Sequence, residues 1–401
     1  MPENLKLRML EAYPVEYEGR KMIMLPDPER LGDNGIKVTL PGYYLMNLMD
    51  GTRTNEQIIE SFENQFGQTV QMDDLIELAG QLDQAYLFDN QRYADYKKNV
   101  IQQFRDSVTR PAVFAGKSYS EDPDELLKSI EKMIGKPGPK ASGDLKAIVV
   151  PHIDFSIGGD MMASGWREVM ETDAELFVIL GTGHSMKDDF FSCIDKDFET
   201  PIGTMKVDHD FLSKLNLNFG EGLFDHVEAH RSEHSIEFQS LFMAWLARSR
   251  LDIKAVPILL SYPEGAWNND DPIFNGERID RFIDALGRTA KADARKVIFV
   301  ASVDFSHVGS RFGDEEKLSE KKLKAIETDD RALLERVSEI DPSGFLNRIV
   351  DTNPTNRVCG FPALYTLLKL TDAKKGKLSE YRQNIEGEMD TMVSFATMSL
   401  Y

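Results

Sequence analysis

Residues 296–307 read KVIFVASVDFSH, an unbroken apolar run that ends in short polar side chains and a histidine. Three runs of the same kind come earlier in the chain: KAIVV at 146–150, LFVIL at 176–180 and IKAVPILL at 253–260. Apolar runs rich in Val and Ile are typical of strands that are buried on both faces, as in a parallel sheet. We therefore expect the four runs to pair in one sheet.

Amphipathic stretches separate or follow these runs and predict helices at 236–249, 279–292, 317–337 and 363–370. Strands that alternate with helices indicate β-α-β units and a mostly parallel sheet flanked by helices. The end of the chain differs, because MVSFATMSLY at 392–401 alternates apolar and polar residues after a separate segment at 378–385. Such a pair predicts two antiparallel strands at the sheet edge. The fold class is therefore α/β.

Histidines follow three of the four runs. His152, His184 and His307 each come within a few residues of the end of a run, beside glycine, proline or short polar residues that suit a turn. In an open α/β sheet, the carboxyl ends of the strands form the crevice that binds ligands. A single histidine at a strand end is commonly a structural hydrogen-bonding group, but three at one sheet edge predict a shared site.

Cys359 is the fourth candidate, since NRVCGFPALYTLLKL (356–370) places it at a turn that leads into a helix. The positive end of a helix lowers the pKa of a thiol and favours the thiolate, the form that binds metals. One thiolate with neutral imidazoles suits iron, copper or zinc better than magnesium or calcium. The separations in sequence match no local metal motif, so this expectation depends on the histidines that follow strands. A small buried cysteine is the alternative.

The other histidines and the other cysteine have less support as site residues. His226, His230 and His234 recur every fourth residue in HVEAHRSEH. This spacing would align them on one helix face as a zinc site, although a solvated polar stretch explains the same residues. Cys193 is expected to be a small buried side chain, and His209 to lie on the surface.

Seven segments occur in order along the second part of the chain: AGKSY (115–119), PHIDFSIGG (151–159), LGTGHS (180–185), ETPIGTMKVD (199–208), EHSIEFQ (233–239), VASVDFSHVGSRFG (300–313) and VCGFPALYTLL (358–368). This series resembles the successive motifs of the Memo family, in bacteria the AmmeMemoRadiSam system protein B. The resemblance extends from residue 113 to about residue 370, and the final strands fit it as well. It implies a Memo-like α/β domain.

The Memo family is similar in fold to the class III extradiol dioxygenases, which hold a non-haem iron with two histidines and a glutamate beside a catalytic histidine. The resemblance places His152 and His184 on the two histidine-ligand positions, and Cys359 on the position of the glutamate. It places His307 on the position of the catalytic histidine. Asp304, three residues earlier, is a candidate to orient a neighbouring histidine. The implied metal is Fe(II), with Cu or Zn as alternatives.

Three further residues are expected around these ligands. Asp154 is a candidate hydrogen-bonding partner of the pocket, and His234 and Glu237 from the EHSIE segment are expected at its rim. The sequence also departs from the family at two places. Ser118 stands where an aromatic residue is usual, and residues 361–362 are Phe-Pro where animal members have Arg-His. The second change removes polar groups near the pocket, so the substrate does not follow from the resemblance.

The N-terminal part predicts a separate small domain at 1–92, joined by a linker helix at 93–110 to the Memo-like domain at 111–401. Thr54-Asn55-Glu56-Gln57 is a capping-box pattern that opens the first of two helices, and the outline is an α+β winged helix. DNA binding is disfavoured because residues 31–92 carry 10 acidic and 3 basic side chains. The order of elements also resembles the PqqD-like peptide-recognition domain. A helical cap that packs on the larger domain is the alternative.

Composition narrows the class of partner. The chain has 67 acidic and 47 basic residues, a net charge of −20 that would repel phosphate backbones and anionic lipid. Small molecules, metals or peptides are the expected partners, and nucleic acids and membranes are not. The first residues contain no signal-peptide core, and only two cysteines are present. We expect a cytoplasmic protein with reduced thiols.

Three functions are compatible with this sequence. The first is a metal-dependent redox or dioxygenase-like activity at His152, His184, His307 and Cys359. The second is a non-catalytic module that binds a peptide or a metal beside a radical SAM protein in a modification system. The third is a zinc-dependent hydrolase, because two imidazoles and one thiolate leave a position for water.

Overall fold

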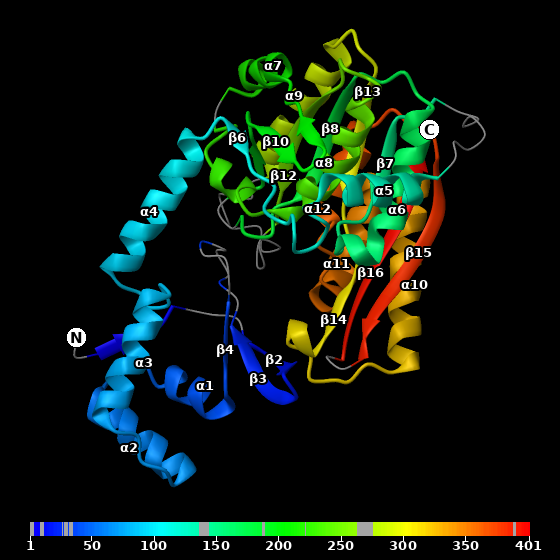
Figure 1. Cartoon of the computed structure of the whole chain (residues 1–401). Coiled ribbons are helices and arrows are strands. Elements are labelled where there is room, and N and C mark those ends of the chain that lie inside the picture. The colour runs from blue at the N-terminus through cyan, green and yellow to red at the C-terminus, as the bar shows by residue number, and fades with distance from the viewer. Residues whose placement is uncertain are drawn as a thin grey trace. The chain divides into compact units, whose positions relative to one another are not determined.

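The four apolar runs form the middle of one sheet in the computed structural model of the chain (Figure 1). The strands lie side by side and parallel in the order β7 (Ala147–Val150), β13 (Val297–Ser302), β8 (Leu176–Thr182) and β12 (Lys254–Leu260). The prediction of a mostly parallel sheet is confirmed. The structure describes residues 4–8, 12–25, 27, 31, 35–135, 144–186, 189–220, 222–262, 276–387 and 390–401.

The register brings the ends of three strands to one level. Ser302 of β13 pairs with Val150 of β7 on one side and with Gly181 of β8 on the other. Each of these residues lies at or next to the carboxyl end of its strand. The segments that leave β7, β8 and β13 therefore start beside one another, and they carry the three histidines that the sequence singled out.

Antiparallel strands complete the sheet at both sides. β16 (Thr391–Leu400) pairs with β7, with β14 (His307–Gly309) and with β15 (Gly376–Glu386), while β9 (Phe191–Cys193) pairs with β12. The antiparallel arrangement of the last two strands is as predicted. The predicted position of this pair at the sheet edge is also confirmed. β15 is the outer strand and pairs along the whole of β16, whose other side pairs with β14 near its start and with β7 near its end.

Helices cover both faces of the sheet. One face packs against α5 (Pro123–Ile134), α6 (Phe155–Met170) and α8 (His234–Ala247). The other packs against α7 (His209–Phe219), α9 (Gly276–Ala292), α10 (Glu320–Ser338), α11 (Pro342–Asn356) and α12 (Phe361–Leu370). Alternate strand residues point to the two layers, so every strand of the middle is apolar on both sides.

Close packing of α6 depends on a glycine. A Cβ atom at Gly165 would stand 2.4 Å from Cγ1 of Val150, so a larger residue would push the helix away from β7. The neighbouring Trp166 packs its ring 5.8 Å from the ring of Phe177 on β8. The helix is thereby held against the two strands whose ends carry His152 and His184.

The chain divides into two compact units, Met1–Asp106 and Ser107–Tyr401. The first unit is a small α+β structure with its own apolar core. Its strands are β1 (Asn4–Lys6), β2 (Tyr13–Tyr17), β3 (Arg20–Leu25), β4 (Ile36–Val38) and β5 (Asp50–Thr54). Its helices are α1 (Leu40–Asn47), α2 (Asn55–Phe66), α3 (Met72–Gln84) and α4 (Gln91–Asp106). β1 pairs with β5, and β2, β3 and β4 form a separate antiparallel sheet.

Two predictions for this part can be compared with the structure. The capping box at Thr54 is confirmed, since its side chain accepts from the backbone of Gln57 and the Gln57 side chain accepts from the backbone of Thr54. The linker helix expected at 93–110 ends earlier, at Asp106, because β6 (Thr109–Arg110) pairs with β10 (Asp197–Thr200) of the second unit. None of the described helices is long and apolar enough to span a bilayer.

Candidate metal centre

His152 leaves the end of β7 and is almost completely buried, with 1% of its surface exposed. Its Nδ1 lies 2.8 Å from the carbonyl oxygen of Ser302, which can only accept, so Nδ1 carries the hydrogen. Its backbone N–H donates to Oδ1 of Asp304 at 3.0 Å. These two bonds orient the ring, and Nε2 lies 3.4 Å from Sγ of Cys359.

His184 and His234 share one carboxylate. Oε1 of Glu233 lies 3.0 Å from Nδ1 of His184 and 3.1 Å from Nδ1 of His234. The same carboxylate accepts from the backbone N–H groups of His184, His234 and Ser235, and therefore caps the N-terminus of α8. Burial would raise the pKa of Glu233, but the two imidazoles hold it well below its usual range. Both imidazoles can donate Nδ1–H to this ionised group and keep Nε2 available.

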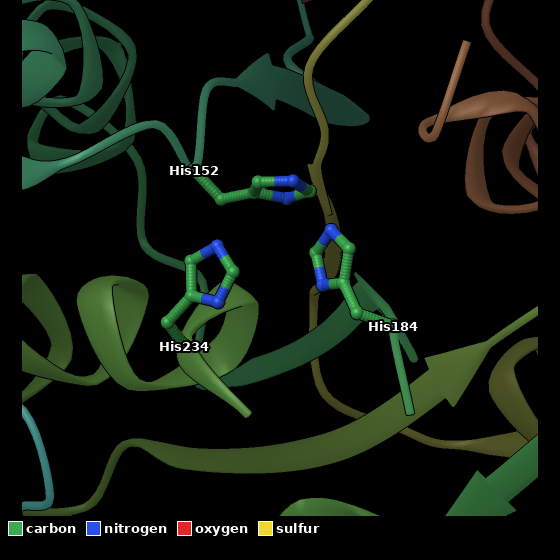
Figure 2. Close-up of side chains that lie close together, drawn as sticks. All are labelled: His152, His184 and His234. Atoms are coloured by element: carbon green, nitrogen blue, oxygen red, sulfur yellow. The ribbon is translucent and has the colours of Figure 1, made fainter. Parts of the chain in front are cut away.

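The three imidazoles form a group of metal-binding size (Figure 2). Each of His152, His184 and His234 offers a ligand nitrogen, and these nitrogens lie within 4.8 Å of one another. The rings of His184 and His234 face each other at 4.8 Å, and the ring of His152 stands nearly perpendicular to both. Carboxylate and carbonyl acceptors on the outer nitrogens are the usual partners of metal-binding histidines.

Cys359 approaches the same group from the turn before α12. Its Sγ lies 3.4 Å from Nε2 of His152 and 3.7 Å from the backbone oxygen of Asp304. A Cβ atom on the next residue, Gly360, would stand 2.5 Å from Cβ of Val303 and 2.7 Å from the oxygen of Asp304. Only glycine allows the turn to come so close to the end of β13, and this approach places the thiol beside His152.

The charges of Cys359 and His152 support each other. Burial would raise the pKa of the Cys359 thiol, but the neighbouring His152 and His307 lower it to about 5. Burial would lower the pKa of His152, but Asp304 and Cys359 raise it to about 9. The two groups are therefore a thiolate and an imidazolium near neutral pH, and a metal that binds both would replace the proton of His152.

His307 lies beside the group but not in it. It begins β14, and its Nδ1 lies 2.9 Å from the carbonyl oxygen of Phe305 and 3.2 Å from that of Arg357. Its ring packs edge-on against Phe312, with centroids 5.2 Å apart. Because both partners of Nδ1 are carbonyl oxygens, Nδ1 carries the hydrogen and Nε2 can accept a proton.

The remaining candidates occupy supporting positions. Asp304 is buried, with Oδ2 3.7 Å from Nε2 of His152. Asp154 caps α6 through the backbone and hydroxyl of Ser156. Glu237 lies on the first turn of α8 and pairs with Arg110, an ion pair in which both side chains are fully buried. Sequence reasoning gave His234 a place at the rim, whereas the structure brings its imidazole as close as those of His152 and His184.

The alternative zinc site on one helix is wrong. His226 precedes the short helix η1 (Val227–His230), His230 ends it, and His234 begins α8, so the three residues do not share a helix face. The ring of His230 instead points to the carbonyl oxygen of Ser192 at 3.0 Å. Within the described parts of the chain, only His234 of these three belongs to a metal-sized group.

Two residues have roles that differ from those predicted from the sequence. Glu233 was missed as a site residue, because glutamate is not among the side chains that usually cap a helix N-terminus. Phe361 was expected to change the pocket, but it is 3% exposed and packs its ring near Phe345, Tyr365 and Tyr262. The Phe-Pro departure therefore affects packing of α12.

The donor set fits a transition metal. Imidazole nitrogens bind such metals at about 2.0–2.1 Å and thiolates at about 2.3 Å, so two such donors at a tetrahedral angle are about 3.5 Å apart. The observed separation of 3.4 Å between Cys359 Sγ and His152 Nε2 agrees with this geometry. Nitrogen and sulfur donors favour iron, copper or zinc over magnesium or calcium.

Comparison with known families shows which family the second unit resembles. The family model described as Memo-like protein matches residues 110–399, most of the chain. The chain belongs to the Memo family. The Memo match begins at Arg110, close to the start of the second compact unit at Ser107.

Relatives of two lengths are similar to this chain. A MEMO1 family protein of Aquifex aeolicus is 28% identical over 89% of this chain and 90% of its own length. One of Thermus thermophilus is 26% identical over 88% of this chain and 100% of its own length. One of Methanobrevibacter smithii is 26% identical over 98% of its own length but only 72% of this chain. The Methanobrevibacter relative is therefore shorter than this chain, and is close in length to residues 110–399 alone.

Proposed function

We propose that this Memo protein is a metal-dependent oxidoreductase that holds iron or copper through His152, His184 and Cys359. The observation that supports this proposal best is the arrangement of two imidazoles and a thiolate: Nδ1 of each ring is held by an outer acceptor, and Nε2 of His152 lies 3.4 Å from Sγ of Cys359. Iron or copper in this position would supply one-electron redox chemistry. His234 lies within reach as a fourth donor and completes the ring of nitrogens on the side of His184.

The chain's own residues would orient the site and handle protons. Ser302 and Glu233 fix the rings of His152 and His184 through Nδ1, so that neither ring needs to rotate when a metal binds. The Nε2 atom of His307 can take or give a proton beside the site, because its Nδ1–H already donates to a backbone oxygen. His307 would therefore act on the substrate and not as a ligand.

Access to the site differs from one side to the other. The side chain of His184 is 36% exposed and that of His234 is 21% exposed, whereas His152 is buried. A small molecule or a peptide side chain would therefore approach over His184 and His234. Cys359 and Asp304 would form the inner wall.

Metal analysis of protein purified without oxygen tests the identity of the metal. Iron or copper close to one atom per chain is the expected result. A zinc-loaded protein with no bound iron or copper would overturn the redox proposal and favour hydrolysis. Protein that binds none of the three metals on titration would leave the domain as a binding module.

Single substitutions test the ligand assignment. His152→Ala, His184→Ala and Cys359→Ser should each weaken Fe(II) binding by more than the roughly 10- to 100-fold typical of a residue outside the ligands. His307→Ala should keep most of the metal affinity. Cys193→Ser is the matched control, because Cys193 is buried in the core on β9. If His307→Ala weakens binding as much as His152→Ala, His307 is a ligand and its proposed proton-transfer role is lost.

A further inference from the structure

A cavity of about 280 Å³ lies at the amino ends of β7 and β13, at the end of the sheet opposite to the metal centre. Lys146 and Lys296 directly precede the two strands and line this cavity, whereas His152 and Asp304 follow the same strands. A strand rises about 3.3 Å per residue, so the cavity and the metal centre are about 20 Å apart. The two sites therefore cannot contact the same small ligand.

The cavity has an apolar floor and a cationic wall. The floor is formed by Gly287, Ala290, Val297, Phe299 and Leu370. Four cations, Lys146, Lys291, Arg295 and Lys296, and two carboxylates, Asp144 and Asp372, complete the lining. Arg295 is already paired with Asp208 and Asp293, so the three lysines are the cations that a ligand can reach. Lys296 is also paired with Asp173, whose side chain is 88% exposed. An apolar hollow with a few polar groups is the usual form of a small-molecule site.

The cations are better fixed than the carboxylates that accompany them. The side chains of Lys146 and Lys296 are 29% and 31% exposed, while those of Asp144 and Asp372 are 61% and 64% exposed. Ion pairs with such exposed carboxylates contribute about 0–1 kcal/mol, so a bound anion can replace them. Among the described residues, Lys291 contacts no acidic group, and its charge is available to a ligand.

Gly287 keeps the floor open. It lies inside α9, where glycine costs about 1 kcal/mol relative to alanine. A Cβ atom there would stand 3.3 Å from Cδ2 of Leu370, and a longer side chain would enter the cavity. The absence of a side chain at this position therefore leaves space that a ligand can use.

We propose that this cavity binds a small organic anion with a short apolar tail. The anionic group lies between Lys146, Lys291 and Lys296, and the tail lies on Phe299 and Leu370. Carboxylates and phosphate monoesters share this chemistry. A neutral molecule gains nothing from the lysines, and an amine is repelled by them.

Titration of the full-length protein with hexanoate and hexyl phosphate, followed by calorimetry or NMR, tests the proposal. Hexan-1-ol and hexylamine are the neutral and cationic controls. We expect saturable binding of at least one anion, about tenfold weaker binding of the alcohol, and no binding of the amine. The anion that binds more tightly shows whether the natural ligand is a carboxylate or a phosphate monoester.

Two substitutions locate the binding. Lys291→Glu reverses an exposed charge, and Gly287→Leu fills the apolar floor of the cavity. Each should weaken binding of the anion by about tenfold or more. Lys128→Glu on α5 is the matched control and should change nothing. Circular dichroism establishes that each variant is folded. Equal binding of hexan-1-ol and hexanoate, no saturable binding, or anion binding that neither Lys291→Glu nor Gly287→Leu weakens would overturn the proposal.

Discussion

Glu233 caps the N-terminus of α8 and Glu237 lies in its first turn, and both carboxylates are buried, yet they contact different regions. Glu233 contacts two imidazoles of the metal centre. Glu237 contacts Arg110, the hydroxyl of Tyr119 and the backbone N–H groups of Val113 and Phe114. The first carboxylate orients site residues, and the second fastens the segment at the start of the Memo domain to α8.

The partners explain the difference. An imidazole can lose its proton, so the charge near Glu233 changes when a metal or a proton binds. The guanidinium of Arg110 is permanently charged, and it also donates to the backbone oxygens of Glu233 and His230. Of these two buried carboxylates, Glu233 has partners that can titrate and orients the site, whereas Glu237 has a partner that cannot titrate and stabilises the fold. The two regions nevertheless touch, because Arg110 holds the backbone of the residue that orients His184.

The largest expected effect comes from Glu237→Ala. Both members of the Arg110 and Glu237 pair are fully buried, and removal of one leaves an uncompensated charge. Such a loss typically costs about 3–5 kcal/mol of unfolding free energy. Urea unfolding of parent and variant measures this value. A loss below about 1 kcal/mol would show that Arg110 finds another acceptor or reaches water.

The pH dependence of stability should depend on His230, which packs beside Arg110. Burial lowers the pKa of His230 to about 3, while the unfolded chain has the ordinary value near 6.5. Between these values the unfolded state takes up a proton that the folded state does not, so stability falls as the pH falls below 6.5. From pH 7.5 to pH 5 this contribution is about 2 kcal/mol.

The difference between parent and His230→Asn isolates this contribution. Unfolding free energies are measured for both proteins at pH 7.5 and at pH 5. We expect the parent to lose more stability than the variant over this interval. Equal losses in the two proteins would mean that His230 accepts a proton in the folded state.

Glu233→Gln should separate the metal centre from the fold. The amide keeps the size of the side chain and one acceptor for the helix cap, but it removes the charge that orients His184 and His234. Metal affinity should fall about 10- to 100-fold, the usual effect of losing such a partner. Glu237→Gln is the matched control, and Fe(II) titration compares the two. If Glu237→Gln lowers the Fe(II) affinity as much as Glu233→Gln does, the two carboxylates do not have separate functions.

The smallest expected effect is removal of the first unit. A fragment of residues 107–401 keeps Arg110 and every candidate ligand, and should bind Fe(II) within about twofold of the full chain. A fragment of residues 112–401 lacks Arg110 and should lose stability as Glu237→Ala does. Melting and metal titration of both fragments test this pair of expectations. An insoluble 107–401 fragment would show that the first unit is needed for folding.

Local sequence patterns were sufficient to predict much of this structure. The unbroken apolar runs predicted the parallel strands, because a strand that is covered on both faces has no polar side. The same pattern placed His152, His184 and His307 at one end of the sheet. The capping box at Thr54 followed from two side chains three residues apart. Each of these features depends on neighbours in sequence, so the sequence by itself determined them.

Only the tertiary structure decided which groups meet across long separations. Glu233 and His184 are 49 residues apart, and Arg110 and Glu237 are 127 residues apart, so no local period connects either pair. The regular spacing of His226, His230 and His234 suggested one helix face, but the break between η1 and α8 turns His230 toward Ser192 and His234 toward the site. The pairing of β16 with β7, a strand from much earlier in the chain, likewise follows from no local pattern. A residue pattern determines which side chains can be buried, whereas contacts between distant segments determine what each buried group touches.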